Sequence, residues 1–202
     1  MGPVYKSRFS RLPTAGRQYW NVRTLLGPYS VTWDAGDPVQ AGRLFRGGAP
    51  SSGKNGSFPG LASSVAQLYE LYTFTNAASS TDLVTVSLTG SSDGNCFFSA
   101  WWFFNPADLT GSAANYLGDA GLTYPPDVLF PQSFSLLVPG HTTFFIVANS
   151  IDGIDSRGGA YTFTVTGPDV VAGSGGGFHP KPRPRGIDRA FCPDPAARGI
   201  PE

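Results

Sequence analysis

The feature that most constrains this fold is a run of nine residues, Cys96 to Phe104, that is almost entirely apolar or aromatic. Successive side chains of a β-strand point to opposite faces of a sheet, so this run places large rings on both faces. A sheet with one face in water cannot accommodate it, and both faces must be covered. We therefore expect a central strand here, with part of its aromatic surface available for a partner, namely Trp101, Trp102 and Phe103.

The rest of the chain also indicates an all-β protein. The 26 Gly and 18 Pro residues favour turns and extended segments, and short runs with alternating apolar and polar residues lie between those turns. About seven or eight such strands are typical of an antiparallel β-sandwich. Besides the central run, the expected strands cover residues 29–33, 43–45, 68–74, 83–89, 132–138, 142–148 and 161–166.

Three regions follow from changes in composition. Residues 1–41 are expected to form a basic extended arm with one short strand. Residues 42–167 hold the remaining strands and are expected to form the sandwich. Residues 168–202 begin with a Gly-rich linker and continue as a Pro/Arg-rich tail, which we expect to be extended.

Charge is distributed unevenly although the net charge is zero. Residues 1–46 carry seven Lys/Arg against two acidic residues, whereas residues 47–167 carry two against eight. A basic arm can lie on its own acidic body, on a neighbouring protein, or on an anionic membrane. Nucleic acid is not supported as a partner, because no recognition motif accompanies the basic residues. Charged residues make up only 14% of the chain, which is low for a free soluble protein.

The two extended arms carry isolated large or charged side chains that need a surface on which to dock. A segment of this composition cannot form a core of its own, so contact with a partner would have to order it. The candidate partner-binding residues of the arms are Tyr19, Trp20, Arg183, Arg185 and Phe191.

The chain has only two cysteines, Cys96 and Cys192, and two histidines, which argues against a zinc site. The two cysteines are candidates for a disulfide that would pin the tail to the central strand, and spacing alone leaves this open. No apolar run approaches the ~20 residues of a membrane span. Residues 1–20 lack the apolar segment of a signal peptide.

Neither histidine belongs to a recognisable catalytic arrangement. His141 follows Pro139-Gly140 in an expected hairpin turn, and no G-x-S-x-G motif is present. We therefore do not expect an enzyme, and no cofactor is indicated. Asp152 and Asp155 are weak candidates for a Ca²⁺ site, because the full ligand spacing of a calcium loop is absent.

A series of weak motifs across residues 42–167 resembles the extracellular β-sandwich modules of bacterial surface proteins, akin to the pre-peptidase C-terminal (PPC) type. The motifs occur in the order Gly42 to Ser52 (GRLFRGGAPSS), Tyr72 to Asn76 (YTFTN), Phe104 to Leu109 (FNPADL), Asn115 to Gly121 (NYLGDAG), Phe134 to Gly140 (FSLLVPG) and Tyr161 to Val165 (YTFTV). The resemblance implies a jelly-roll-like, non-catalytic module that is extracellular or periplasmic. The half-cystines that such modules often carry are missing here.

Two functions remain open at this point. The first is a non-catalytic structural or accessory subunit, held by its arms and an aromatic face in a larger bacterial assembly. That assembly is a surface filament or layer, or a membrane complex to which the protein is bound peripherally. The alternative is an adhesin-like carbohydrate- or surface-binding module in which exposed Trp rings stack on sugars, with or without the assistance of Ca²⁺.

Overall fold

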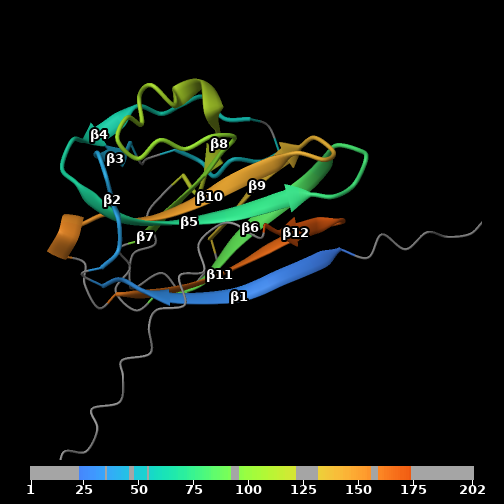
Figure 1. Ribbon diagram of the computed structural model, residues 1–202, viewed down its shortest axis with the longest axis horizontal. Coiled ribbons are helices and arrows are strands. Elements are labelled where there is room, and N and C mark those ends of the chain that lie inside the picture. The colour runs from blue at the N-terminus through green and yellow to red at the C-terminus, as the bar shows by residue number, and fades with distance from the viewer. Residues whose placement is uncertain are drawn as a thin grey trace, which may run out of the picture.

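The computed structural model describes residues 23–34, 36–45, 48–53, 55–91, 96–121, 132–155 and 159–173. These residues form an all-β fold of antiparallel strands, and the expected β-sandwich is confirmed at this level. Figure 1 shows two layers of strands, with β1 and β11 in one and β5 and β10 in the other. Loop segments cover the outer side of the second layer.

The first layer is a four-stranded sheet in the order β1-β11-β6-β9, which we call the four-stranded sheet. All its pairings are antiparallel, and β11 and β6 are its two central strands. The strands are β1 (Thr24–Thr32), β6 (Asp82–Ser91), β9 (Gln132–Val138) and β11 (Ala160–Gly167).

The second layer has the order β12-β5-β10-β7-β8, with β2 pairing the start of β5. A separate two-stranded sheet is formed by β3 and β4, and two 3-10 turns, η1 and η2, complete the fold. The strands are β2 (Val39–Gln40), β3 (Arg43–Leu44), β4 (Leu61–Ser63), β5 (Gln67–Asn76), β7 (Cys96–Trp101), β8 (Tyr116–Asp119), β10 (Thr143–Ser150) and β12 (Val170–Ala172), and the turns are η1 (Ala113–Asn115) and η2 (Gly153–Asp155).

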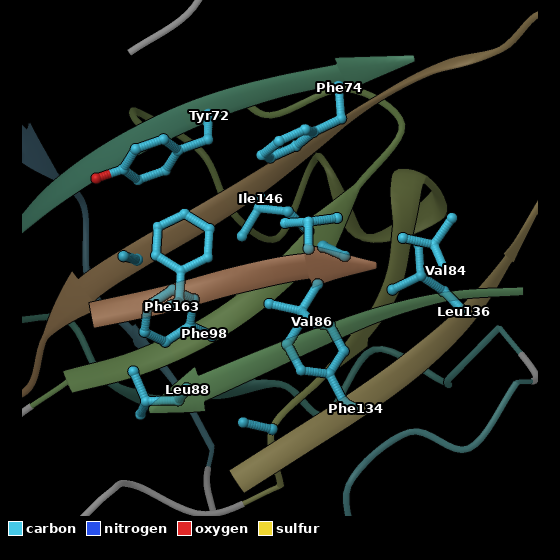
Figure 2. Packing of buried hydrophobic residues seen from close by; sticks show 14 of the residues in the cluster. Tyr72, Phe74, Val84, Val86, Leu88, Phe98, Phe134, Leu136, Ile146 and Phe163 are labelled. Atoms are coloured by element: carbon cyan, nitrogen blue, oxygen red, sulfur yellow. The ribbon is translucent and has the colours of Figure 1, made fainter. Parts of the chain in front are cut away.

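The first hydrophobic core lies between the two layers. Alternate residues of each strand point into it, as period-2 patterning requires, and Phe163 at its centre is fully buried. Figure 2 shows Tyr72 and Phe74 of β5 pointing across the gap towards Phe163 of β11. Ring pairs give this core specific geometry, because Tyr72 and Phe163 meet edge to face with centroids 4.8 Å apart.

A second hydrophobic core lies on the other face of the second layer. The described parts of segments 41–61 and 102–115 cover that face, and the N–H of Ala41 donates to the carbonyl of Pro106 at 2.7 Å, which ties the two segments together. The strand β7 lies between the two cores, and all six of its residues are buried. The buried members of the second core are Leu44, Phe97, Trp101, Phe104, Leu109, Tyr116 and Val147.

One loop joins the two layers along one side of the sandwich. The N–H of Ser51 donates to the carbonyl of Asp119 in β8, and the carbonyl of Ser51 accepts from the N–H of Ser135 in β9. The N–H groups of Gly53 and Gly56 donate to the carbonyls of Ser135 and Leu117 in the same two strands. This loop therefore pairs the edge of β9 at Ser135 and the edge of β8 at Leu117 and Asp119, which protects part of both edges.

The sandwich extends beyond the expected residues 42–167 at both ends. The strand β1 is longer than the expected 29–33 and pairs with β11 over its whole length, with a register shift between Leu26 and Tyr29. The strand β12 pairs with β5 after the expected boundary. Gly27 and Pro28 favour an arm at residues 24–28. Strand pairing and the packing of Leu26 and Tyr29 against the first core instead make these residues part of β1.

One strand of the second layer is missing from the expected set. The strand β8 (Tyr116–Asp119) follows a 3-10 turn at Ala113–Asn115. The expected strand 132–138 coincides with β9. The observed strand order is that of an antiparallel sandwich, and the finer jelly-roll topology stays a prediction.

Candidate interaction surface

The aromatic side chains of the central strand are covered by the chain itself. Trp101 is 0% exposed, its indole N–H donates to the hydroxyl of Ser99 at 2.9 Å, and its ring meets Tyr116 and Phe104 with centroids 5.3 and 5.6 Å apart. The prediction that Trp101 binds a partner is therefore wrong. The physical reason is that loop segments, rather than another protein, cover the outer face of β7.

The other two residues of the expected aromatic surface differ from Trp101. Trp102 is half-buried against the first core, and its backbone N–H donates to the carbonyl of Asn115 at 2.7 Å. Phe103 is 58% exposed and remains a candidate contact residue. The run from Cys96 to Phe104 thus contributes one exposed ring rather than a broad aromatic face. The candidate residues of the arms lie outside the described residues: Tyr19, Trp20, Arg183, Arg185 and Phe191.

Cys96 is a free cysteine at the start of β7, buried in the first core. Burial raises the pKa of its thiol well above the usual value, and the negative charge of Glu70 adds to the effect. A thiol in this environment stays protonated and is a poor nucleophile. The pairing with Cys192 stays a prediction, because Cys192 lies outside the described residues.

The acidic turn at Asp152 and Asp155 is formed as a short 3-10 turn, η2, with Asp152 on the exposed side. Within the described residues, no group of three or more His, Cys, Asp or Glu side chains is placed to hold a metal ion. The Ca²⁺ prediction gains no support from this arrangement, since a calcium site needs six to eight oxygen ligands.

A further candidate surface is the outward face of the four-stranded sheet. Directly paired residues of neighbouring strands point to the same face, so the pairing register identifies its members. Among the paired outward positions that the structure describes, none carries a charge; besides Ala160 and Gly90 they are all Thr, Ser or Leu. We call this set the hydroxyl face: Leu25, Ser30 and Thr32 of β1, Thr162, Thr164 and Thr166 of β11, Leu83, Thr85 and Ser87 of β6, and Ser133, Ser135 and Leu137 of β9.

The hydroxyl face is divided into an apolar end and a polar end. Leu83 and Leu137 are paired directly and are 37% and 42% exposed, and Leu25, 63% exposed, lies one row away on β1. Towards the other end, hydroxyls bond each other across strands, as between Ser30 and Thr162 at 3.1 Å. These bonds satisfy part of the hydroxyl groups within the sheet and reduce the cost of removing the face from water.

The two strands that adjoin the arms lie beside each other. The strand β1 follows the N-terminal arm and the strand β12 precedes the C-terminal tail, and both are edge strands of their sheets. The hydroxyl of Thr24, the first residue of β1, donates to the carbonyl of Pro168 at 3.1 Å. The strands β1 and β12 therefore lie beside each other, and the C-terminal tail begins after Gly173, whose N–H donates to the carbonyl of Thr73 in β5 at 2.8 Å.

A groove of about 430 Å³ lies on another part of the surface, beside the loop that joins the two layers. A buried pair lies at its base, where the hydroxyl of Tyr116 donates to Oδ2 of Asp119 and the N–H of Gly121 donates to Oδ1 at 2.7 Å. Burial raises the pKa of Asp119, although both hydrogen bonds act to lower it. Phe45, 57% exposed, and Pro50 supply apolar lining.

The sequence already contained the signal for the hydroxyl face. Threonines of residues 161–166 and of residues 83–89 alternate with apolar side chains, which predicts one polar face on each strand. What could not be foreseen was that β11 and β6 lie side by side, with β1 and β9 flanking them. Only this order brings the four uncharged strand faces together into one surface.

Comparison with family models, with curated proteins and with solved structures finds no match for this chain. The resemblance to PPC-type modules therefore stays a prediction. Within the described residues, no helix has the length and apolar character needed to cross a membrane.

Proposed function

We propose that this protein is a non-catalytic structural or accessory subunit that docks into a larger bacterial assembly. The observation that carries this proposal is the hydroxyl face, an outward sheet surface without a charged side chain at any of its twelve described positions. Soluble domains usually place charges of both signs on about 25–35% of their surface, which keeps them apart. Interface cores, in contrast, are depleted in charge.

The arms give the proposed docking a second set of contacts. They carry the basic and aromatic residues predicted to bind a partner, and they join the sandwich at Thr24 of β1 and after Gly173, which follows β12. The strands β1 and β12 lie beside each other, so a partner that covers the β1 edge of the face would lie next to both arms. Extended arms gain contact area without needing a core, at the cost of ordering entropy.

The ionisable groups of the interior favour a structural role over catalysis. Tyr72 and Tyr161 share a hydrogen bond of 2.8 Å, and the hydroxyl of Tyr72 also donates to Glu70 at 2.8 Å. Burial raises the pKa of both tyrosines and of Cys96, which keeps these groups protonated. Such a network fixes the packing of the core and offers no activated nucleophile.

Native electrophoresis of the tagged chain from its own cells tests the proposal. We expect the wild-type chain to migrate in a complex well above its own 21.3 kDa. Truncation to residues 23–173, which keeps every described strand, should release the chain as a free domain with unchanged thermal stability. A wild-type chain that migrates at its monomer mass would contradict the proposal. Fractionation of the same cells tests the proposed extracellular, periplasmic or membrane-peripheral location.

The groove beside Phe45 favours a second candidate function, binding of a carbohydrate. Its volume lies in the ~300–1,000 Å³ range of small-ligand sites, and an exposed ring next to polar groups suits a sugar. A glycan array tests this candidate: Phe45→Ala should abolish binding, whereas Phe103→Ala, at a similarly exposed ring outside the groove, should not. Trp101 cannot serve in such stacking, because it is buried.

A further inference from the structure

We infer that the hydroxyl face pairs with the hydroxyl face of a second copy of this chain, so that two four-stranded sheets pack face to face about a two-fold axis. This inference rests on the proposed structural function and identifies one partner of the protein in the assembly, namely a second copy of the same chain. Sheets commonly pack in this way inside β-sandwiches, with the strands of the two sheets roughly aligned. An uncharged face is best matched by a partner surface that is also uncharged. A second copy offers such a surface, because the paired outward positions of its own face carry no charge.

The strand order sets how the two copies meet. A two-fold axis parallel to the strands places β1 of one copy over β9 of the other, and β11 over β6. Leu25 at one edge then lies over Ser135 at the other edge, one row along the strand from Leu137, so the apolar ends of the two faces overlap. The hydroxyl ends meet in the same way, and their side chains can donate and accept in either direction.

The area of the face predicts a weak pairing. Four strands about 4.8 Å apart and about seven residues at about 3.3 Å each give a face of roughly 19 by 23 Å, or about 440 Å² per copy. A standard interface buries about 800 Å² of accessible surface per partner. The sheet alone therefore supports a reversible pairing rather than a permanent dimer.

The alternative occupants of this face fit less well. A basic or acidic partner would lose the hydration of its charges against a surface that offers no counter-charge. An extended peptide would have to add to a sheet edge, but the edge of β9 is paired at Ser135 by the Ser51–Gly53 loop and β1 carries a register shift at its centre. A second copy meets neither obstacle.

Sedimentation of the purified full-length chain from about 1 µM to about 300 µM tests the inference. We expect a monomer–dimer equilibrium for the wild-type chain. Thr164→Lys, at the middle of the face, should weaken it about 100-fold or more, since two buried lysines would face an uncharged surface. Leu137→Lys, at an edge-strand position that is 42% exposed, provides a second variant if Thr164→Lys lowers folding.

The matched control is Thr143→Lys. Thr143 is an exposed strand residue of β10, where its hydroxyl bonds that of Thr75 at 2.9 Å on the other sheet. We expect this variant to associate within about threefold of the wild-type chain. A wild-type monomer throughout would overturn the inference, as would unchanged association in both face variants or an equal loss in the control. A monomeric purified chain that still migrates in a large cellular complex would overturn only the pairing and leave the proposed function standing.

Discussion

Trp101 is held on every side by residues of its own chain. Its ring lies against Phe104 and Tyr116, its indole N–H is bonded to Ser99, and no part of it reaches the solvent. A ring in this position contributes to stability through burial and through the ring–ring contacts around it. Its neighbour Phe103 is 58% exposed, so removal of that ring should change the stability little.

Trp101→Ala should therefore lower the free energy of unfolding by about 3–5 kcal/mol, because it removes a fully buried ring and leaves a cavity. Denaturant unfolding followed by circular dichroism measures the change. Phe103→Ala serves as the control and should stay within about 0.5 kcal/mol of the wild type. Equal and small effects in both variants would show that Trp101 is not packed as described.

Asp119 connects stability to pH. Burial raises the pKa of its carboxyl in the fold, and the unfolded chain restores the ordinary value. Between these two values the folded state holds a proton that the unfolded state has released. The contribution of Asp119 to stability is thus fully present below the unfolded pKa and is lost as pH rises through the folded pKa.

Asp119→Asn should remove this part of the pH dependence, since an amide does not titrate. Denaturation midpoints measured between about pH 3 and about pH 7 should fall more steeply with rising pH in the wild type than in the variant. Parallel curves for Asp119→Asn and the wild type would contradict the assignment.

At the scale of elements, the loop of residues 48–56 depends on close approach to β8. Gly121 follows β8 with φ +74°, and a Cβ there would lie 2.5 Å from the carbonyl oxygen of Gly48 and 2.6 Å from the nitrogen of Pro50. These are backbone atoms that cannot rotate away. A side chain at Gly121 would therefore displace the loop from the end of β8. The displacement would break the hydrogen bonds of the loop to Asp119 and Ser135.

Gly121→Ala should cost about 3 kcal/mol of stability or more, from the positive φ and the displaced backbone together. Gly60→Ala isolates the first of these effects, because Gly60 has φ +84° and no atom lies within 4 Å of its Cβ position. That control should cost about 1 kcal/mol. Thermal unfolding of the two variants separates the effect of the positive φ from that of the displaced backbone. Equal losses of stability in the two variants would rule out the close approach at Gly121.

Strand positions could be predicted well where one face of a strand is buried. The alternation in residues 132–138 and 161–166 predicted β9 and β11, since period-2 patterning is set by burial on one side. The strand β8 was missed because Tyr116–Asp119 is buried on both faces and includes Gly118, so its four residues show no alternation. Edge pairing of β1 with β11 was also invisible, because a contact between residues 24 and 167 leaves no local pattern.

At the scale of the whole molecule, the need to cover both faces of the central strand was predicted correctly. The segments that cover those faces were not predicted. The run Cys96 to Phe104 requires cover on both faces, and the chain supplies it with β3 and a loop, whose Leu44 and Leu109 belong to the same buried cluster as Trp101. Loop cover depends on contacts distant in sequence, which composition and periodicity do not record. The hydroxyl face depends in the same way on the strand order β1-β11-β6-β9.

The central claim is that the uncharged face of the four-stranded sheet holds this protein in an assembly. Native electrophoresis of chains expressed in the protein's own cells, carrying Thr164→Lys or the control Thr143→Lys, tests it most directly. The account predicts that the control migrates with the wild-type chain in a high-mass complex, whereas Thr164→Lys migrates as a folded monomer. Recovery of Thr164→Lys in the same complex, in the same amount as the control, would contradict the account.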